Sequence, residues 1–331
     1  MGWWQVNADT LAGSRFVVSP LAEATASLKT LERGTAAYPA ERAWLDAHLP
    51  AYRDRLADDP VTGLLIKAAF GSSWNATFLT PTPAGDGADA FAGDGGRAFA
   101  GELARVRRTP PETVRADLAE ALGGPLPAVL DRPDLAERAA DLLEWVWTRA
   151  VLPDWTRRRG VIEADVLART ARLGQDGWAA ALDGMRPGMR WLGGGRLQIT
   201  AHDHPPRELS GARLLFVPVT PRQSWLAWDA AHRSAVVYPC SGPLAEAGRT
   251  PVPEALGTLL GPGRAAVLTL LDAPKSTTQL VALTGQGLGS VGRHLKVLRD
   301  GNLVQRRRAG RSVLYYRTLA GEVLVTAQRH G

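Results

Sequence analysis

The residues with the clearest chemistry lie in the last quarter of the chain, where cationic side chains recur at short spacing. Two of them, Arg293 and Lys296, are followed closely by four more arginines: Arg306, Arg307, Arg308 and Arg311. A guanidinium can donate two parallel hydrogen bonds to guanine, and guanidinium and ammonium groups neutralise phosphates. This chemistry is that of a nucleic-acid interface.

Three helical patterns and a hairpin pattern hold these side chains. Ser276 stands where an N-cap is expected, before the second helix, and apolar residues recur at helical spacing in all three. We expect these apolar residues to be core: Val267, Leu270, Leu271, Val291, Leu295, Val297 and Leu298. Strands are expected at 303–304 and 313–316, on either side of an arginine-rich turn. Three helices followed by a hairpin predict a winged helix-turn-helix.

The charge of this segment agrees with that reading. Residues 262–317 carry ten lysines and arginines and two aspartates, a net charge of +8. The whole chain is +6, so the remainder is −2. A basic module on a slightly acidic body is typical of a protein that binds nucleic acid.

The same residues carry a family resemblance. The segment 290–304 resembles the recognition-helix signature of ArsR-type winged-helix regulators, and 310–317 resembles their wing and return strand. The resemblance implies a homodimeric transcription factor, most often a repressor, with one recognition helix on each half-site of double-stranded DNA. It also implies that the helix at 254–260 and a last helix after 318 form the dimer interface. The domain has no cysteine, so metal sensing through thiolates is not expected.

DNA contacts are expected from three places. The N-terminal half of the third helix enters the major groove in this motif, the start of the second helix meets phosphates, and the wing follows the backbone or minor groove. The predicted DNA-binding residues are Thr277, Thr278, Ser290, Arg293, His294, Lys296, Arg306, Arg307, Arg308 and Arg311. For His294, packing or a phosphate contact competes with base reading. Gly289 and Gly292 are expected to loosen the recognition helix in the absence of DNA.

The rest of the chain predicts an α+β protein that is mainly helical. Residues 1–240 read as a large helical domain with a small β-sheet, 241–253 as a linker, and 254–331 as the winged helix-turn-helix. Ser19 and Pro20 mark the start of one helix. Further helices are expected at 40–56, 61–70, 97–106, 111–122, 135–151 and 161–182, and strands at 196–200, 214–217 and 235–238.

The composition and the N-terminal sequence indicate in which cellular compartment the protein is expected. One cysteine, Cys240, cannot form an internal disulfide, which fits a reducing environment. The N-terminus lacks a secretory signal pattern, and no apolar run reaches the roughly twenty residues of a membrane span. We therefore expect a cytoplasmic protein without a membrane partner.

Eleven tryptophans are the second unusual feature. Indoles usually fill a core, but several together also suit a flat organic ligand. Trp145 and Trp228 are the candidate walls of such a ligand pocket. The whole-chain layout resembles long actinobacterial ArsR-type regulators with an N-terminal domain of unknown function, through residues 16–23. That layout favours a sensor role for the first domain.

Two other classes remain open. His202, Asp203 and His204 are the one close cluster of metal-binding types, which a metal-dependent enzyme would need. No nucleophile elbow, P-loop or zinc-protease motif accompanies it, so neither an enzyme nor a cofactor is expected. The other class is an architectural protein that binds DNA without sequence preference, with which the arginine-rich wing is compatible.

Overall fold

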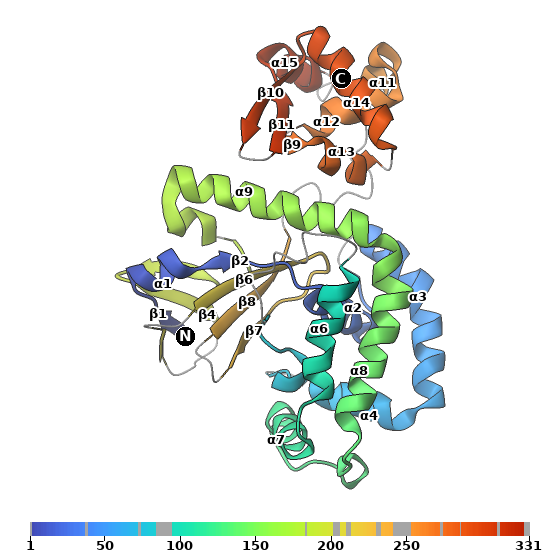
Figure 1. Ribbon diagram of the computed structural model, residues 1–331, viewed down its shortest axis with the longest axis vertical. Coiled ribbons are helices and arrows are strands. Elements are labelled where there is room, and N and C mark those ends of the chain that lie inside the picture. The colour runs from blue at the N-terminus through green and yellow to red at the C-terminus, as the bar shows by residue number, and fades with distance from the viewer. Residues whose placement is uncertain are drawn as a thin grey trace. The chain divides into compact units, whose positions relative to one another are not determined.

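A computed structural model describes residues 2–36, 39–71, 74–83, 95–182, 184–200, 206–209, 213–229, 233–240, 253–271, 274–284, 286–309 and 312–327. The chain is α+β, mostly helical with several small sheets, which confirms the predicted class (Figure 1). Its contacts divide it into two units, Met1–Trp155 with Arg169–Cys240 and Thr156–Ala168 with Ser241–Gly331. From the sequence, residues 156–168 were expected to belong to the first domain, whereas their contacts group them with the second unit. The predicted linker, 241–253, lies outside the described residues except for Pro253.

The first unit is rich in helices. They are α1 (Ala8–Gly13), α2 (Pro20–Arg33), α3 (Pro39–Asp58), α4 (Pro60–Ala69), α6 (Gly96–Arg107), α7 (Pro111–Leu122), α8 (Leu135–Val146) and the shared α9 (Trp155–Leu182), with short turns at Thr77–Leu79, Ala128–Leu130, Trp147–Val151 and Leu152–Asp154. Ser19 caps α2 by accepting a 3.0 Å hydrogen bond from the Ala22 N–H, and Pro20 follows at the first helical position. The predicted cap and the predicted helices are confirmed.

Two four-stranded sheets complete the first unit, where the sequence predicted one small sheet. In the first, β2 (Arg15–Phe16), β6 (Arg213–Val219) and β8 (Arg233–Pro239) are parallel, and β7 (Trp225–Trp228) pairs antiparallel with β8. The second has the order β3-β4-β1-β5, formed by β3 (Arg190–Gly193), β4 (Arg196–Thr200), β1 (Gly2–Gln5) and β5 (Arg207–Glu208). The prediction of a single sheet was wrong because β1 and β2, at the N-terminus, pair with strands far along the chain.

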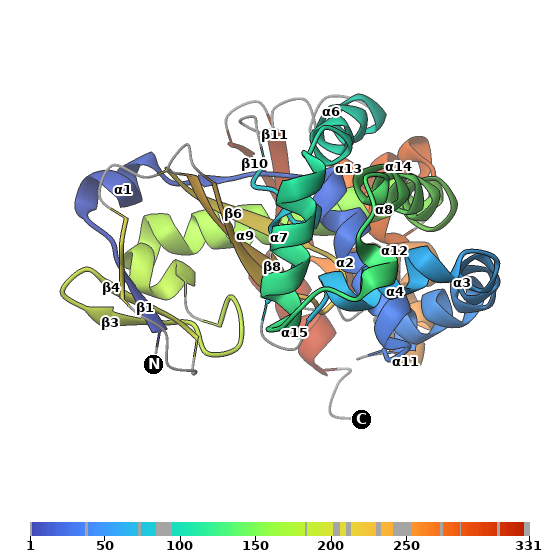
Figure 2. The same ribbon diagram turned by 90° about the horizontal axis from the view of Figure 1, so that it is seen from below.

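Helix α2 joins the sheet to the helices. Ala22 and Ala26 on one side of α2 are buried against Val217 and Trp225 of the sheet β2-β6-β8-β7. Other sides of α2 contact α3, α6 and α8, and Figure 2 shows α2 among these helices. Because α2 is covered on all sides, residues 20–31 are buried along their whole length.

The second unit has a different composition of elements. They are α11 (Glu254–Leu260), α12 (Pro262–Leu270), β9 (Lys275–Ser276), α13 (Thr277–Thr284), α14 (Leu288–Asp300), β10 (Val304–Ala309), β11 (Ser312–Arg317) and α15 (Leu319–Ala327). The hairpin β10-β11 pairs with β9 through β11. Ser276 Oγ accepts from the Gln279 N–H at 3.2 Å, and Gln279 Oε1 accepts from the Ser276 N–H at 2.6 Å. This reciprocal capping box confirms the predicted cap of α13.

Candidate nucleic-acid interface

Helix α14 separates an apolar face from a charged one. Val291, Leu295 and Leu298 are buried, whereas Arg293 and Lys296 are exposed. Val297, predicted as core, is 47% exposed, so that prediction was wrong. The reason is geometric: Val297 lies two residues after Leu295, which turns it about 200° away from the buried face. The exposed face of α14 is therefore basic.

Ser290 and His294 form a small polar network on the side of α14. The Ser290 hydroxyl donates to Gln286 Oε1 at 3.2 Å and lies 3.3 Å from His294 Nε2. The His294 ring also lies against Gly263 of α12, where an added Cβ would come within 2.6 Å of Nε2. Partial burial lowers the pKa of His294, and the positive charges of Arg264 and Arg293 lower it further. This environment favours a packing role for a neutral His294.

Lys296 has a partner within α14. Its Nζ lies 3.0 Å from Asp300 Oδ2, one turn further along α14. The hydrogen bond that Lys296 donates is the main reason why the pKa of Asp300 lies below its usual range. Both side chains are more than half exposed, so the pair is weak and a phosphate can compete for Lys296.

The three described arginines of the hairpin lie on β10. Arg306, Arg307 and Arg308 pair with Tyr315, Leu314 and Val313 of β11, and all three arginines are exposed. Because side chains alternate along a strand, Arg306 and Arg308 share one face and Arg307 lies on the other. Arg306 and Arg308 therefore present two cations on one face of the hairpin. Arg311 lies outside the described residues.

The start of α13 supplies little further evidence. Thr277 is half-buried at its first position, and the side chain of Thr278 lies outside the described residues. Leu288, the first residue of α14, is not among the predicted DNA-binding residues, and its side chain is 64% exposed. Its place one residue after the helix cap Gly287, at the N-terminal end of α14, was the available signal.

Trp145 and Trp228 line two separate grooves of the first unit. Trp145 borders a groove of about 630 Å³ together with His48, Asp54, Arg55 and Arg149 among others. Trp228 packs edge-on against Trp74, with 5.4 Å between the ring centroids, beside a hollow of about 50 Å³. The two sets of lining residues do not overlap. The two indoles therefore do not face each other across one pocket.

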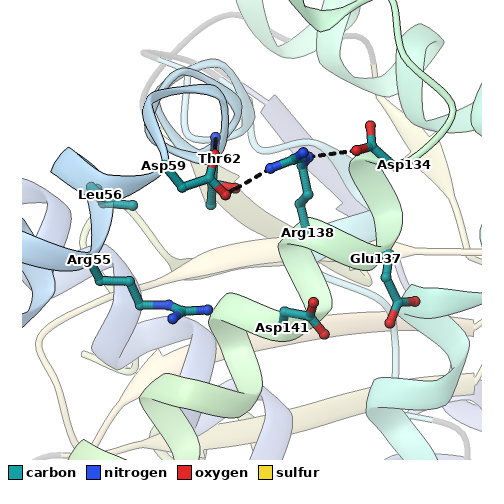
Figure 3. Close-up of a pocket in the computed structure, with 8 residues that line it drawn as sticks. All are labelled: Arg55, Leu56, Asp59, Thr62, Asp134, Glu137, Arg138 and Asp141. Atoms are coloured by element: carbon teal, nitrogen blue, oxygen red, sulfur yellow. Dashed lines mark hydrogen bonds and ion pairs between the residues drawn. The ribbon is translucent and has the colours of Figure 1, made fainter.

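A third groove, of about 290 Å³, adjoins that of Trp145 and is shown in Figure 3. Arg138 reaches from α8 to Asp59 at 2.8 Å and to Asp134 at 2.7 Å. Burial alone would raise the pKa of Asp59, but hydrogen bonds from Thr62 and Arg138 hold it below its usual range. These charges join α4 to α8 and are satisfied by one another.

The described residues contain no group of three or more histidine, cysteine or acidic side chains placed to hold a metal ion. The cluster His202, Asp203 and His204 falls outside those residues. In the same part of the chain, no helix is both long and apolar enough to cross a membrane.

Comparison with protein-family models, with curated proteins and with solved structures finds no match to the chain.

Proposed function

We propose that the chain is a sequence-specific DNA-binding transcriptional regulator of the winged-helix type, which acts in the cytoplasm as a homodimeric repressor. The observation that carries the proposal is the basic exposed face of α14, with Arg293 and Lys296 opposite the buried Val291 and Leu295. The order of α12, α13, α14 and the hairpin supports it, since a helix in this place reads the major groove in winged-helix proteins.

Exposed apolar residues on the outer helices of the second unit support a dimer. Leu319 and Val323 are 82% and 60% exposed and lie one turn apart on α15. Leu259, on α11, is 63% exposed. An exposed apolar pair one turn apart, such as Leu319 and Val323, is typical of a surface that a partner covers. A second copy of the chain is the partner that the proposal requires.

The first unit supports a sensor role through the groove beside Trp145. Its volume of about 630 Å³ falls in the range of small-molecule sites, and the Trp145 ring supplies an aromatic wall. The Arg55 guanidinium lies 6.0 Å from the centre of that ring. A small organic ligand with both aromatic and charged groups suits such a lining.

Two matched substitutions test sequence-specific binding. Arg293→Ala removes a base contact, so we expect the affinity for the preferred duplex to fall by roughly fivefold to a hundredfold and the preference at one position of each half-site to relax. Arg306→Ala removes a phosphate contact, so all sequences weaken alike and the slope of log affinity against log salt falls by about one. Fluorescence anisotropy on the preferred duplex and on single-base variants measures both effects. Identical behaviour of the two variants on every sequence would instead favour an architectural protein.

A further inference from the structure

Leu288 is an exposed apolar side chain at the N-terminal end of α14. It is the first residue of α14 and is 64% exposed, while Arg293 and Lys296 are exposed on the same helix. Single exposed leucines are common on proteins. This one is different because two of its neighbours on the helix, Gly289 and Gly292, are glycines.

The glycines leave Leu288 as the projecting side chain of the first helical turn. Gly292 lies one turn further along, directly beside Leu288 on the helix surface, and Gly289 follows Leu288 in the chain. A Cβ added at either glycine would have no atom within 4 Å. The space around Leu288 is therefore open, and a surface that approaches this turn meets the leucine first.

We propose that Leu288 reads thymine, by packing its side chain on the C5-methyl group in the major groove. The proposal rests on the DNA-binding function proposed above. The thymine methyl is the one apolar group that the four bases present in that groove, whose other edge atoms are hydrogen-bond donors and acceptors. A leucine placed over those polar atoms would remove water without replacing its hydrogen bonds, which costs free energy. Leu288 thus favours thymine and disfavours the other bases.

The cations of the second unit indicate which occupant covers Leu288. Arg293 and Lys296 on α14, with Arg306 and Arg308 on one face of the hairpin, present cations to a polyanion. An apolar protein partner would have to bury these cations, whereas a duplex pairs them with phosphates. Leu288 and Arg293 are five residues apart, about 140° around the helix, so they meet different base pairs. The half-site therefore combines a thymine read by Leu288 with a guanine read by Arg293.

The test uses the full chain and a duplex enriched from a random library. Each thymine of the enriched site is replaced in turn by deoxyuridine, which lacks only the C5-methyl. We expect one position in each half-site at which the loss of the methyl weakens binding by about fourfold. Leu288→Ala should lose this discrimination, and its affinity for the thymine duplex should fall by a similar factor.

Val297→Ala is the matched control, because it shortens an exposed apolar side chain on the other side of the same helix. It should retain the discrimination between thymine and deoxyuridine. Two results would overturn the role of Leu288 without contradicting the proposed function. One is an enriched site at which no deoxyuridine weakens binding, and the other is a Leu288→Ala variant that still discriminates between thymine and deoxyuridine. A library from which no sequence is enriched would overturn the proposed function together with it.

Discussion

Arginine has different partners in the two units. In the first unit, Arg107 of α6 meets three carboxylates of α8, those of Glu137 at 3.1 Å, Asp141 at 2.7 Å and Glu144 at 2.8 Å. Arg138 is matched in the same way by Asp59 and Asp134. These arginines join helices to one another.

In the second unit, the described part of the chain gives no such partner to three arginines of the proposed interface, Arg293, Arg306 and Arg307. Within the described residues, no carboxylate lies within ion-pair distance of Arg293, Arg306 or Arg307. A cation without a carboxylate keeps its full charge for an external anion. Arginine content alone therefore says little about nucleic-acid binding, and the absence of acidic neighbours says more.

Lys29 is a buried cation that differs from the arginines of both units. We expect its substitution to have the largest effect on stability. It lies in the first unit, is 5% exposed, and pairs with no carboxylate of the residues that the structure describes. Its Nζ donates to Asn75 Oδ1 at 2.9 Å and lies 5.2 Å and 5.3 Å from the ring centres of Phe70 and Trp225. Burial lowers the pKa of Lys29 from 10.5 to about 7, and the charges of Arg33 and Arg186 add to the shift.

The sign of the pH dependence follows from that shift. Between about pH 7 and pH 10.5 the unfolded chain keeps the proton that the folded chain has released. The free energy of unfolding therefore rises with pH in this window, by up to about 1.4 kcal/mol per unit from this group. Lys29→Met should unfold at higher urea concentration than the unchanged protein near pH 6.5, and the difference should shrink towards pH 9. The exposed Lys67→Met is the control, and a difference that stays constant with pH would contradict the expectation.

Arg107→Ala tests the opposite case, a cation already matched by carboxylates. Its loss leaves three acidic side chains close together on α8, so we expect about 1 kcal/mol less stability and a Tm lower by about 2–4 °C. Thermal unfolding at low and high salt measures the change in Tm. The loss of stability should be smaller at high salt, because the carboxylates then repel each other less. Arg108 follows Arg107 in the chain, and its side chain donates a hydrogen bond to the Ala104 carbonyl. Arg108→Ala should reduce the stability less than Arg107→Ala does. Equal losses for both variants would mean that the ion pairs of Arg107 do not stabilise the unit.

Asp300→Asn should give the smallest effect. Asp300 is the carboxylate nearest the exposed face of α14, 3.0 Å from Lys296 and 3.7 Å from Arg299. Its neutralisation releases Lys296 for phosphate, so affinity for every duplex should rise by about twofold to fivefold. Fluorescence anisotropy at several salt concentrations measures the change. Glu322→Gln, which removes a carboxylate from α15 instead, should change the affinity less. A loss of affinity in Asp300→Asn would mean that Asp300 positions Lys296 for DNA.

Local signals in the sequence predicted the local structure. Ser19 with Pro20 and Ser276 with Gln279 are helix caps that need only neighbouring residues to form. The sheets could not be predicted in this way, because β1 pairs with β4 and β5 nearly two hundred residues further along. Such pairing depends on the folded chain, and the pattern within one strand does not indicate which distant strand it pairs with.

In the candidate site, too, local features could be predicted from the sequence and contacts between distant segments could not. Periodicity placed Val291, Leu295 and Leu298 in the core, and it follows that Arg293 and Lys296 face outward. Apolar character alone placed Val297 in the core, where its helical angle does not allow it. The packing of His294 against Gly263 joins two helices, and no feature of either segment by itself indicates it.

A competition experiment with DNA tests whether the second unit binds a specific sequence. The purified full chain is mixed with labelled duplex from upstream of its own gene, and unlabelled unrelated DNA is added as competitor. We expect a complex that survives the competitor and protects two half-sites about one helical turn apart, as two recognition helices of a dimer require. Equal affinity for both DNAs would contradict sequence-specific regulation, and no binding to either at low salt would contradict DNA binding itself.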